Sequence, residues 1–336
     1  MISHIARRAS LSRAPWGVVF GLMGSLIPAL AQAQSAEIKP ARIEYEYYPR
    51  TEVRGLGGPD SDARFQAARV SLSLPTPLGE SDTILIPGLR YSLLEVGQST
   101  PTSGGEGRPI EALHSVVLSL GVLQPLDERW SLFAQLGGGL AGNLSSEVAS
   151  DDWVVSAQAL AMWKVAGDFT LGAGLGYDRR TGDVRPLPLV AFDWQPRPDL
   201  LLRGILPQFL ALRYRAGAPV TLAVEASLDG ERYHLSQDDV GVAHGEVAHR
   251  VAKVGPSVTL HWTEWFHTRL AGGVVLDRRF ELYVDDISQG DLDVSKGPYA
   301  GIELWFGPSG WSADAAETAM ATASNASGKA TVVTED

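Results

Sequence analysis

The chain has 336 residues, of which 45% are hydrophobic and 20% charged, and it carries a formal net charge of -11 with no cysteine. This apolar content excludes a chain that is disordered throughout, and the lack of cysteine excludes a disulfide-stapled scaffold, a cysteine-ligated metal site and a thiol nucleophile. The acidity, with no long run of lysine or arginine, argues against a nucleic-acid-binding protein, whose affinity comes mainly from neutralising phosphates.

Residues 1–33 have the organisation of a secretory signal peptide. Three arginines precede an uncharged segment at 14–30, and an Ala-Gln-Ala cleavage site ends at Ala33. The apolar core of that segment would form a helix of about 22 Å, shorter than the ~30 Å hydrocarbon layer of a membrane. We therefore predict that the chain is exported and cleaved after Ala33, and that residues 34–40 form a short N-terminal extension.

From residue 41 onward the sequence alternates apolar with small or polar residues, which is the period of a β-strand with different surroundings on its two faces. The best runs have about the 9 to 11 residues that a transmembrane strand needs, and their polar faces are rich in Gly, Ala and Ser. We count 12 to 14 strands between residues 41 and 306. Prolines interrupt residues 188–216, where a pair of short strands or one kinked strand would both fit.

The connections between these runs alternate in length. Long outer loops and short periplasmic turns are the rule in outer-membrane barrels, and aromatic residues beside the short turns would form a girdle at one membrane interface. The long connections are 54–62, 97–111, 143–152, 237–247 and 285–296, the short ones are 75–81, 124–129, 166–168, 195–199 and 263–264, and the aromatics include Trp130, Trp163, Trp194, Trp262 and Trp305.

Together these features predict an all-β fold, a closed antiparallel transmembrane β-barrel of about 12 to 14 strands over residues 41–306. Alternation alone is equally compatible with a soluble secreted β-sandwich acting as a binding module. Strand length, the small residues on the polar faces and the need to close every strand edge in lipid favour the barrel. Residues 307–336 are rich in Ala, Ser and Thr, and we expect a low-complexity, disordered tail.

The end of the expected barrel resembles the last-strand signal of Gram-negative outer-membrane proteins. In YAGIELWF at 299–306, Tyr299 and Gly301 are followed by Leu304 and by the aromatic Phe306. The resemblance implies that this strand is recognised by the barrel-assembly machinery. In such proteins the terminal aromatic usually ends the chain, whereas here a 30-residue segment, 307–336, follows it.

Residues 41–306 more broadly resemble a family of outer-membrane β-barrels of unknown function, through IEYEY at 43–47, PLDERWSL at 125–132 and ASLDGERYHL at 226–235. The resemblance implies an outer-membrane location, contact with outer-membrane lipid and lipopolysaccharide, and delivery by periplasmic chaperones. From the acidic composition we expect no nucleic-acid partner, and we expect no cofactor. The oligomeric state stays open.

Many charged residues fall on the polar faces of the expected strands. An arginine or lysine that faces lipid at mid-bilayer costs about 2 to 4 kcal/mol. The charged residues therefore should lie on the strand faces that point inward, into a bore that holds water or other side chains. The functional interpretation is a solute pathway whose charges select permeants, and the alternative is a salt-bridged plug that holds the cylinder together. The expected pore-lining residues are Arg42, Glu44, Glu46, Arg69, Arg90, Lys164, Arg213, Glu225, Lys253 and Arg269, and Asp193, Arg215, Asp277 and Glu303 share their phase.

We therefore predict an outer-membrane protein that is not an enzyme, either a passive solute channel or an envelope structural protein. One enzymatic alternative stays open, because His234 and Ser236 lie two apart on one strand face, as the base and nucleophile of a barrel-embedded lipid hydrolase would. His244 and His249, with acids nearby, match no metal-binding template, so we expect no metal site.

Overall fold

The computed structural model describes residues 39–55, 61–79, 82–98, 112–143, 152–178, 186–235, 245–284 and 287–307. The predicted signal peptide and the segment after Gly307 lie outside these residues. Within the described ranges, no helix is long and apolar enough to cross a membrane.

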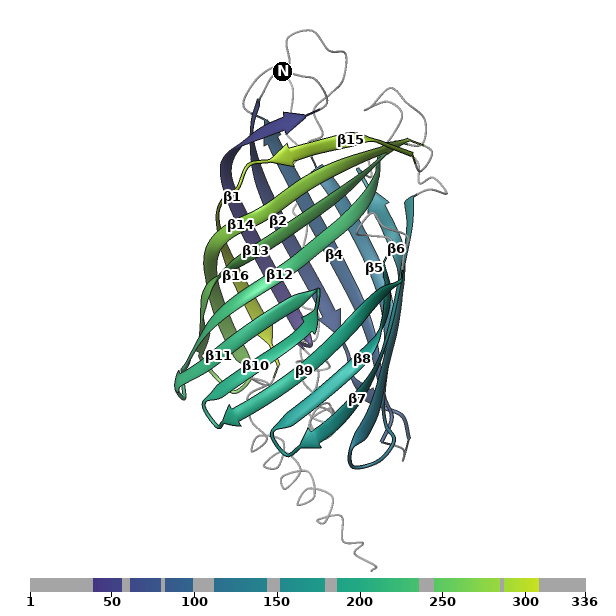
Figure 1. The fold of residues 1–336 in the computed structure, drawn as a ribbon, viewed down its shortest axis with the longest axis vertical. Helices are drawn as coiled ribbons and strands as arrows, with labels where there is room; N and C mark the ends of the chain where they lie inside the picture. The colour runs from purple at the N-terminus through teal and green to yellow at the C-terminus, as the bar shows by residue number, and fades with distance from the viewer. Residues whose placement is uncertain are drawn as a thin grey trace, which may run out of the picture.

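The described residues form sixteen strands (Figure 1). The two-residue β3 pairs only with β4, and β15 pairs with β14 and β1 near the loop end, so fourteen strands make the wall. The strands are β1 (Ala41–Gly55), β2 (Ser61–Ser73), β3 (Thr76–Pro77), β4 (Ile84–Gln98), β5 (Ala112–Pro125), β6 (Trp130–Gly142), β7 (Trp153–Ala166), β8 (Phe169–Asp178), β9 (Leu187–Arg197), β10 (Leu200–Leu206), β11 (Phe209–Gly217), β12 (Val220–Leu235), β13 (Gly245–His261), β14 (Phe266–Val284), β15 (Ile287–Val294) and β16 (Gly297–Phe306).

The sheet closes on itself between the first and last strands. β1 runs antiparallel to β16 in a register from Ala41 opposite Phe306 to Tyr47 opposite Ala300. Because every strand of the wall has a partner on both sides, no open sheet edge runs the length of the molecule. The fold is a closed antiparallel barrel of 14 strands, as predicted, and the β-sandwich alternative is wrong.

The short turns gather at the end of the barrel where β1 begins and β16 ends, except the turn at 207–208, which joins the opposite ends of the short strands β10 and β11 (Figure 1). One of them is held by Asp127, whose carboxylate accepts hydrogen bonds of 2.7 Å from the backbone N–H groups of Arg129 and Trp130. These backbone donors lower the pKa of Asp127. We call this end the short-turn end and the opposite one the loop end.

Residues 188–216 form neither the pair of short strands nor the single kinked strand that the sequence suggested. They belong to three strands, β9, β10 and β11, because Pro198 and Pro207 each stand in a two-residue turn where no ladder donor is needed. The connection expected at 285–296 differs too, because it contains β15.

Side chains alternate between an apolar outer face and the bore. Every strand of the wall carries at least one large apolar side chain that is exposed on the outer face, as a lipid-facing surface requires. One from each strand in chain order is Ile43, Val70, Leu89, Leu118, Leu136, Val155, Leu175, Val190, Leu206, Leu212, Val224, Val258, Leu270 and Ile302.

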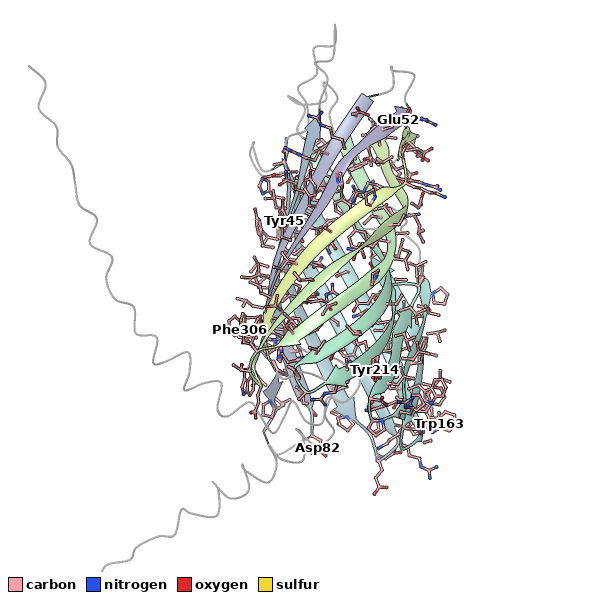
Figure 2. All side chains as sticks on the ribbon, turned by 90° about the vertical axis from the view of Figure 1, so that its left-hand side faces the viewer. Tyr45, Glu52, Asp82, Trp163, Tyr214 and Phe306 are labelled. Carbon is pink, nitrogen blue, oxygen red and sulfur yellow. The ribbon has the colours of Figure 1, made fainter. Side chains whose placement is uncertain are left out.

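Aromatic side chains ring the outer face at the short-turn end. Trp130 and Trp163 on neighbouring strands stack with their ring centroids 5.9 Å apart, and Phe266 stacks on Phe306 at 5.0 Å. Figure 2 places Trp163, Tyr214 and Phe306 in the short-turn half of the barrel wall. This arrangement matches the interfacial belts in which tryptophan and tyrosine are enriched. Trp305, which was expected in this girdle, instead lies on the inner face of β16 and is 2% exposed.

Changing Leu136 to arginine is expected to lower the free energy of unfolding by about 2 to 4 kcal/mol, because this side chain lies mid-strand on the apolar face and is 67% exposed. Ile287 is an almost equally exposed control at 66%, but it is the first residue of β15 and pairs with Val284 at the tip of the loop end. Ile287→Arg should therefore cost little. Urea unfolding in lipid vesicles measures both, and equal effects would contradict a lipid-facing Leu136.

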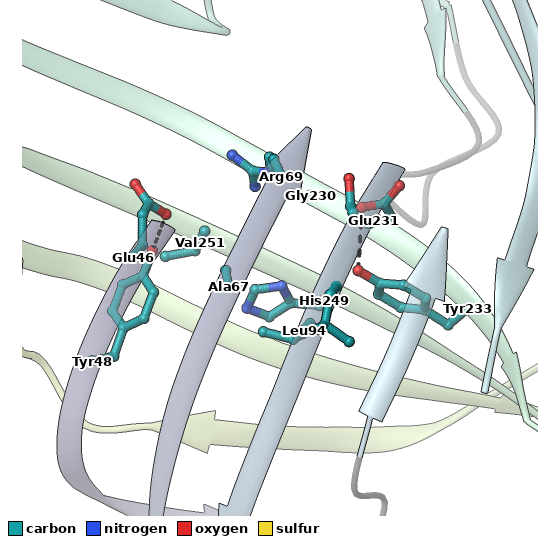
Figure 3. Close-up of a pocket in the computed structure, with 12 residues that line it drawn as sticks. Glu46, Tyr48, Ala67, Arg69, Leu94, Gly230, Glu231, Tyr233, His249 and Val251 are labelled. Atoms are coloured by element: carbon teal, nitrogen blue, oxygen red, sulfur yellow. Dashed lines mark hydrogen bonds between the residues drawn. The ribbon is translucent and has the colours of Figure 1, made fainter. Parts of the chain in front are cut away.

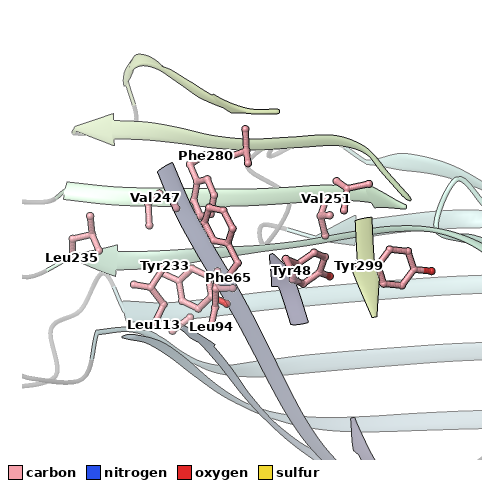
Figure 4. Close-up of a cluster of buried hydrophobic side chains, with 14 of the residues drawn as sticks. Tyr48, Phe65, Leu94, Leu113, Tyr233, Leu235, Val247, Val251, Phe280 and Tyr299 are labelled. Carbon is pink, nitrogen blue, oxygen red and sulfur yellow. The ribbon is translucent and has the colours of Figure 1, made fainter. Parts of the chain in front are cut away.

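Towards the loop end the bore is filled by a cluster of buried apolar side chains (Figure 4). Phe65 of β2 stacks on Phe280 of β14 with centroids 5.4 Å apart, and Leu94, Leu113 and Leu235 meet from β4, β5 and β12. On the outer face of the same level, β14 carries polar side chains. This section therefore has an apolar inside and a polar outside, the reverse of the short-turn half.

Candidate functional site: an ion-pair network in the bore

The strand register places charged side chains in rows across the inner wall. Arg269 on β14 stands opposite Glu303 on β16, Glu303 stands opposite Glu44 on β1, and Glu44 stands opposite Arg69 on β2. Cross-strand neighbours on one face lie close enough to interact. Arg269 Nε lies 2.8 Å from Glu303 Oε2, and Arg69 NH1 lies 3.6 Å from Glu44 Oε2.

Glu303 is the centre of the network at the short-turn end. It is 1% exposed and contacts three cations, because Lys39 Nζ lies 2.5 Å from Oε1, Arg42 Nε lies 2.8 Å from the same oxygen, and Arg269 binds the other. The Lys39 ammonium also lies over the Trp305 ring, 4.2 Å from its centroid. Glu225 extends the network to β12 through ion pairs with Arg269 and, at 3.9 Å, with Arg213.

Further ion pairs cross the bore between strands that are not neighbours in the sheet. Arg69 NH1 on β2 lies 3.7 Å from Asp229 Oδ2 on β12, and Arg90 NH2 on β4 lies 3.7 Å from Glu231 Oε1 on β12. Lys253 on β13 pairs in the same way with Glu46 on β1, and it also lies 3.3 Å from Asp229 on the neighbouring strand β12. Side chains from opposite walls therefore meet within the barrel.

A small cavity lies where the network meets the apolar cluster (Figure 3). Its volume of about 20 Å³ suffices for about one water molecule. Tyr48 OH donates to Glu46 Oε2 at 2.6 Å on one side, and Tyr233 OH donates to Glu231 Oε2 at 3.2 Å on the other. His249 lies between the two tyrosines and stacks on Phe280 with ring centroids 4.6 Å apart.

The expected pore-lining residues divide into two groups. Nine of them belong to the ion pairs described above, and Lys164 alone lies exposed near the end of β7, on the same face as the rest. That they line an open path stays a prediction. The nine are Arg42, Glu44, Glu46, Arg69, Arg90, Arg213, Glu225, Lys253 and Arg269.

Lys39, Asp229, Glu231 and Arg203 were not among the expected residues. Asp229 and Glu231 continue the odd-numbered phase of Glu225, so the alternation of β12 already places them in the bore. Arg203 on β10 stands opposite Asp193 on β9 and binds it through Nε at 2.6 Å, a cross-strand pair that the register alone reveals.

Asp277 was expected in the bore and lies on the outer face instead. The register of β13 with β14 shifts between Ala252 and Lys253, so β14 contains one extra residue at this point. Beyond it, the odd-numbered residues of β14 point outward and the even-numbered ones point into the bore. Asp277 pairs outside with Arg279 at 3.2 Å. Its neighbour Arg278 turns inward, is 2% exposed and lies 3.7 Å from the centroid of the Tyr48 ring.

The residues of the expected assembly signal lie on the closing strand β16. Tyr299 and Gly301 are on the inner face, Leu304 and Phe306 are on the outer face, and the strand pairs with β1 and β14. Recognition by an assembly machinery stays a prediction.

Among the described residues, neither a hydrolase site nor a metal site is assembled. Ser236 and His244 lie outside the described residues, and His234 lies on the outer face of β12 with its backbone opposite Gly142. Glu246 and His249 point to opposite faces of β13, because Glu246 pairs with Arg232 outside while His249 lies in the bore. The described part of the chain holds no group of three or more His, Asp or Glu side chains arranged for a metal ion.

A closed antiparallel cylinder with an apolar outer face and charges inside defines the class of transmembrane β-barrels. The chain belongs to the family described as a domain of unknown function, DUF6268, whose model matches residues 29–289. No curated protein sequence matches it.

Several solved structures of outer-membrane barrels resemble the fold. The COG4313 outer membrane channel from Pseudomonas putida F1 is 12% identical, with a TM-score of 0.42 and coverage of 82% of this chain and 97% of the channel. A Pseudomonas aeruginosa FadL homologue is 12% identical, with a TM-score of 0.38 and coverage of 84% and 93%. LpxR from Salmonella typhimurium is 9% identical, with a TM-score of 0.32 and coverage of 79% and 99%.

Proposed function

We propose that the protein resides in the outer membrane as an envelope structural barrel whose bore is closed at rest. The apolar outer face and the gathering of short turns at one end support this location, with the short-turn end in the periplasm. The single observation that carries the closed bore is the set of ion pairs from β2 and β4 to β12, which cross the lumen.

Two layers of side chains support closure. The ionic layer joins Arg69, Arg90 and Lys253 to Asp229, Glu231 and Glu46 on strands that are not their neighbours, and the apolar cluster of Phe65, Phe280 and their neighbours fills the next layer towards the loop end. About 8 strands leave room only for side chains and 16 to 18 leave a channel, so a 14-strand wall fits either state. The number of strands therefore does not distinguish a closed bore from an open one, and the proposal rests on the side chains that fill the bore.

A passive solute channel is the second candidate, favoured by the length of the cross-bore contacts. At 3.7 Å, the contacts of Asp229 with Arg69 and of Glu231 with Arg90 are longer than a close charge-assisted hydrogen bond of about 2.7 to 2.9 Å. Such contacts would separate more easily than the close pairs around Glu303. A channel of this kind would open only when the two walls disengage.

In planar lipid bilayers, the folded wild-type protein is expected to give no stepwise currents, because both layers block the bore. Incorporation is verified by heat-dependent migration of protein recovered from the bilayer-forming vesicles, and an open porin in the same lipid gives the positive control. Reproducible single-channel steps from the wild type would overturn the closed bore and establish the channel. Recovery of the protein in the soluble periplasmic fraction would overturn the location.

A further inference from the structure

The inner wall formed by β7 to β11 differs in charge from the rest of the bore at the short-turn end. Near β14 and β16, the three acids Glu44, Glu225 and Glu303 pair with the three cations Lys39, Arg42 and Arg269. Among the described residues of the β7–β11 wall, the inner face at the short-turn end carries Lys164, Arg203, Arg213 and Arg215 with Asp193 as the one acid, and Asp178 shares this face only at the opposite end of β8.

The alternation of β11 fixes the direction of two of these arginines. Leu212 and Tyr214 are exposed on the lipid-facing side, whereas Ala211 is buried, so Arg213 and Arg215 point into the bore. In the same way Trp163 faces outward beside Lys164. Figure 2 places their neighbours Trp163 and Tyr214 in the short-turn half of the wall. The cations therefore gather around one side of the mouth.

The nearby acids pair with Arg203 and Arg213 but not with Lys164 or Arg215. Asp193 is bound to Arg203, with Oδ2 2.5 Å from NH2, and Glu225 is bound mainly to Arg269. Lys164 is exposed and Arg215 half-exposed, and neither forms an ion pair with a described residue. The surplus stands out because the whole chain carries a net charge of -11.

We propose that this mouth is a binding site for small soluble oxyanions of the polyphosphate class. A concave wall of low dielectric constant focuses the field of its charges, and arginine and lysine are the residues that hold phosphate oxygens. The side chains face the bore and not the lipid, which favours a soluble anion over a lipid headgroup. That the anion reaches this mouth from the periplasm rests on the proposed function, which places the short-turn end there. Binding of the anion depends only on the charged residues of the wall.

Isothermal titration of the full-length barrel in maltoside micelles with pyrophosphate tests the site. We expect saturable binding that weakens as sodium chloride is raised, since the salt screens exposed charges. Changing Lys164, Arg213 and Arg215 together to glutamate should weaken binding about tenfold or more. Arg203 is left unchanged because its removal would leave Asp193 without its ion-pair partner.

The matched control reverses three exposed cations at the loop end, as Arg54→Glu, Arg279→Glu and Lys296→Glu, and so changes the net charge by the same amount. It should retain wild-type affinity within about twofold, because these charges lie far from the mouth. Absence of saturable binding by the wild type, or an equal loss in both triple variants, would overturn the site.

If the triple reversal prevents folding, Lys164→Gln with Arg215→Gln removes only charges without ion pairs, and weaker binding by this variant is still required. The titration is carried out in detergent, so it is independent of the bilayer and fractionation results that test the proposed function. A barrel that conducts but binds pyrophosphate at this wall would refute the closed bore and keep the site.

Discussion

Replacing Glu303 by alanine is expected to lower the free energy of unfolding of the barrel by about 3 to 5 kcal/mol, because breaking a buried ion pair leaves uncompensated charge behind. Glu303 is 1% exposed, and its two oxygens lie between Lys39, Arg42 and Arg269. Without the carboxylate, these three cations, whose side chains are 15%, 34% and 18% exposed, repel one another. Urea unfolding in lipid vesicles, followed by tryptophan fluorescence, measures the loss.

The matched control is Glu52→Ala. Glu52 also pairs with an arginine, with Oε2 2.6 Å from Arg54 NH2, but the two side chains are 37% and 62% exposed at the loop end. Exposed pairs contribute about 0 to 1 kcal/mol, so this variant should unfold almost like the wild type. A Glu303→Ala barrel as stable as the Glu52→Ala barrel would show that Glu303 does not hold the strands together.

The sequence predicts the closed barrel and the inner face of most strands because both follow from a period of two. Ile43 and Tyr45 alternate with Glu44 and Glu46, and a register slip of one residue would bring both glutamates to lipid. A charge in hydrocarbon is so costly that the phase is fixed locally. The same reasoning places Arg69 and Lys253 in the bore.

The partners of these charges could not be predicted in the same way. Arg69 and Asp229 are far apart in sequence and come from strands that are not neighbours, so their contact depends on barrel diameter and strand stagger. The exchange of Asp277 with Arg278 depends on one extra residue in β14, which the alternation alone does not reveal. The period of two gives the face of each strand, the register gives the pairs between neighbouring strands, and only the closed cylinder gives the pairs across the bore.

Replacing Gly255 by alanine is expected to remove most of the assembled barrel. Gly255 on β13 and Gly273 on β14 stand where the two strands approach each other closely, and the ladder pairs Val254 with Val274 and resumes only at Ser257 with Ala271. An added Cβ on Gly255 would collide with the carbonyl oxygen of Gly272 and lie 2.7 Å from Gly273 Cα. Overpacking usually costs about 1 to 3 kcal/mol, and this contact is with backbone that cannot rotate away, so we expect ~3 kcal/mol.

Gly167 provides the control, because it lies in the turn between β7 and β8 and a Cβ added there would meet nothing within 4 Å. Gly167→Ala should assemble like the wild type, and the amount of heat-modifiable protein in the membrane fraction compares the two. The comparison also tests the packing of the bore. Gly255 lies two residues after Lys253 on β13, and Gly273, next to it on β14, stands opposite Tyr299 of β16. If Gly255→Ala assembles normally, the strands at this point can move apart, and the close fit that brings Lys253 to Glu46 is not required for closure.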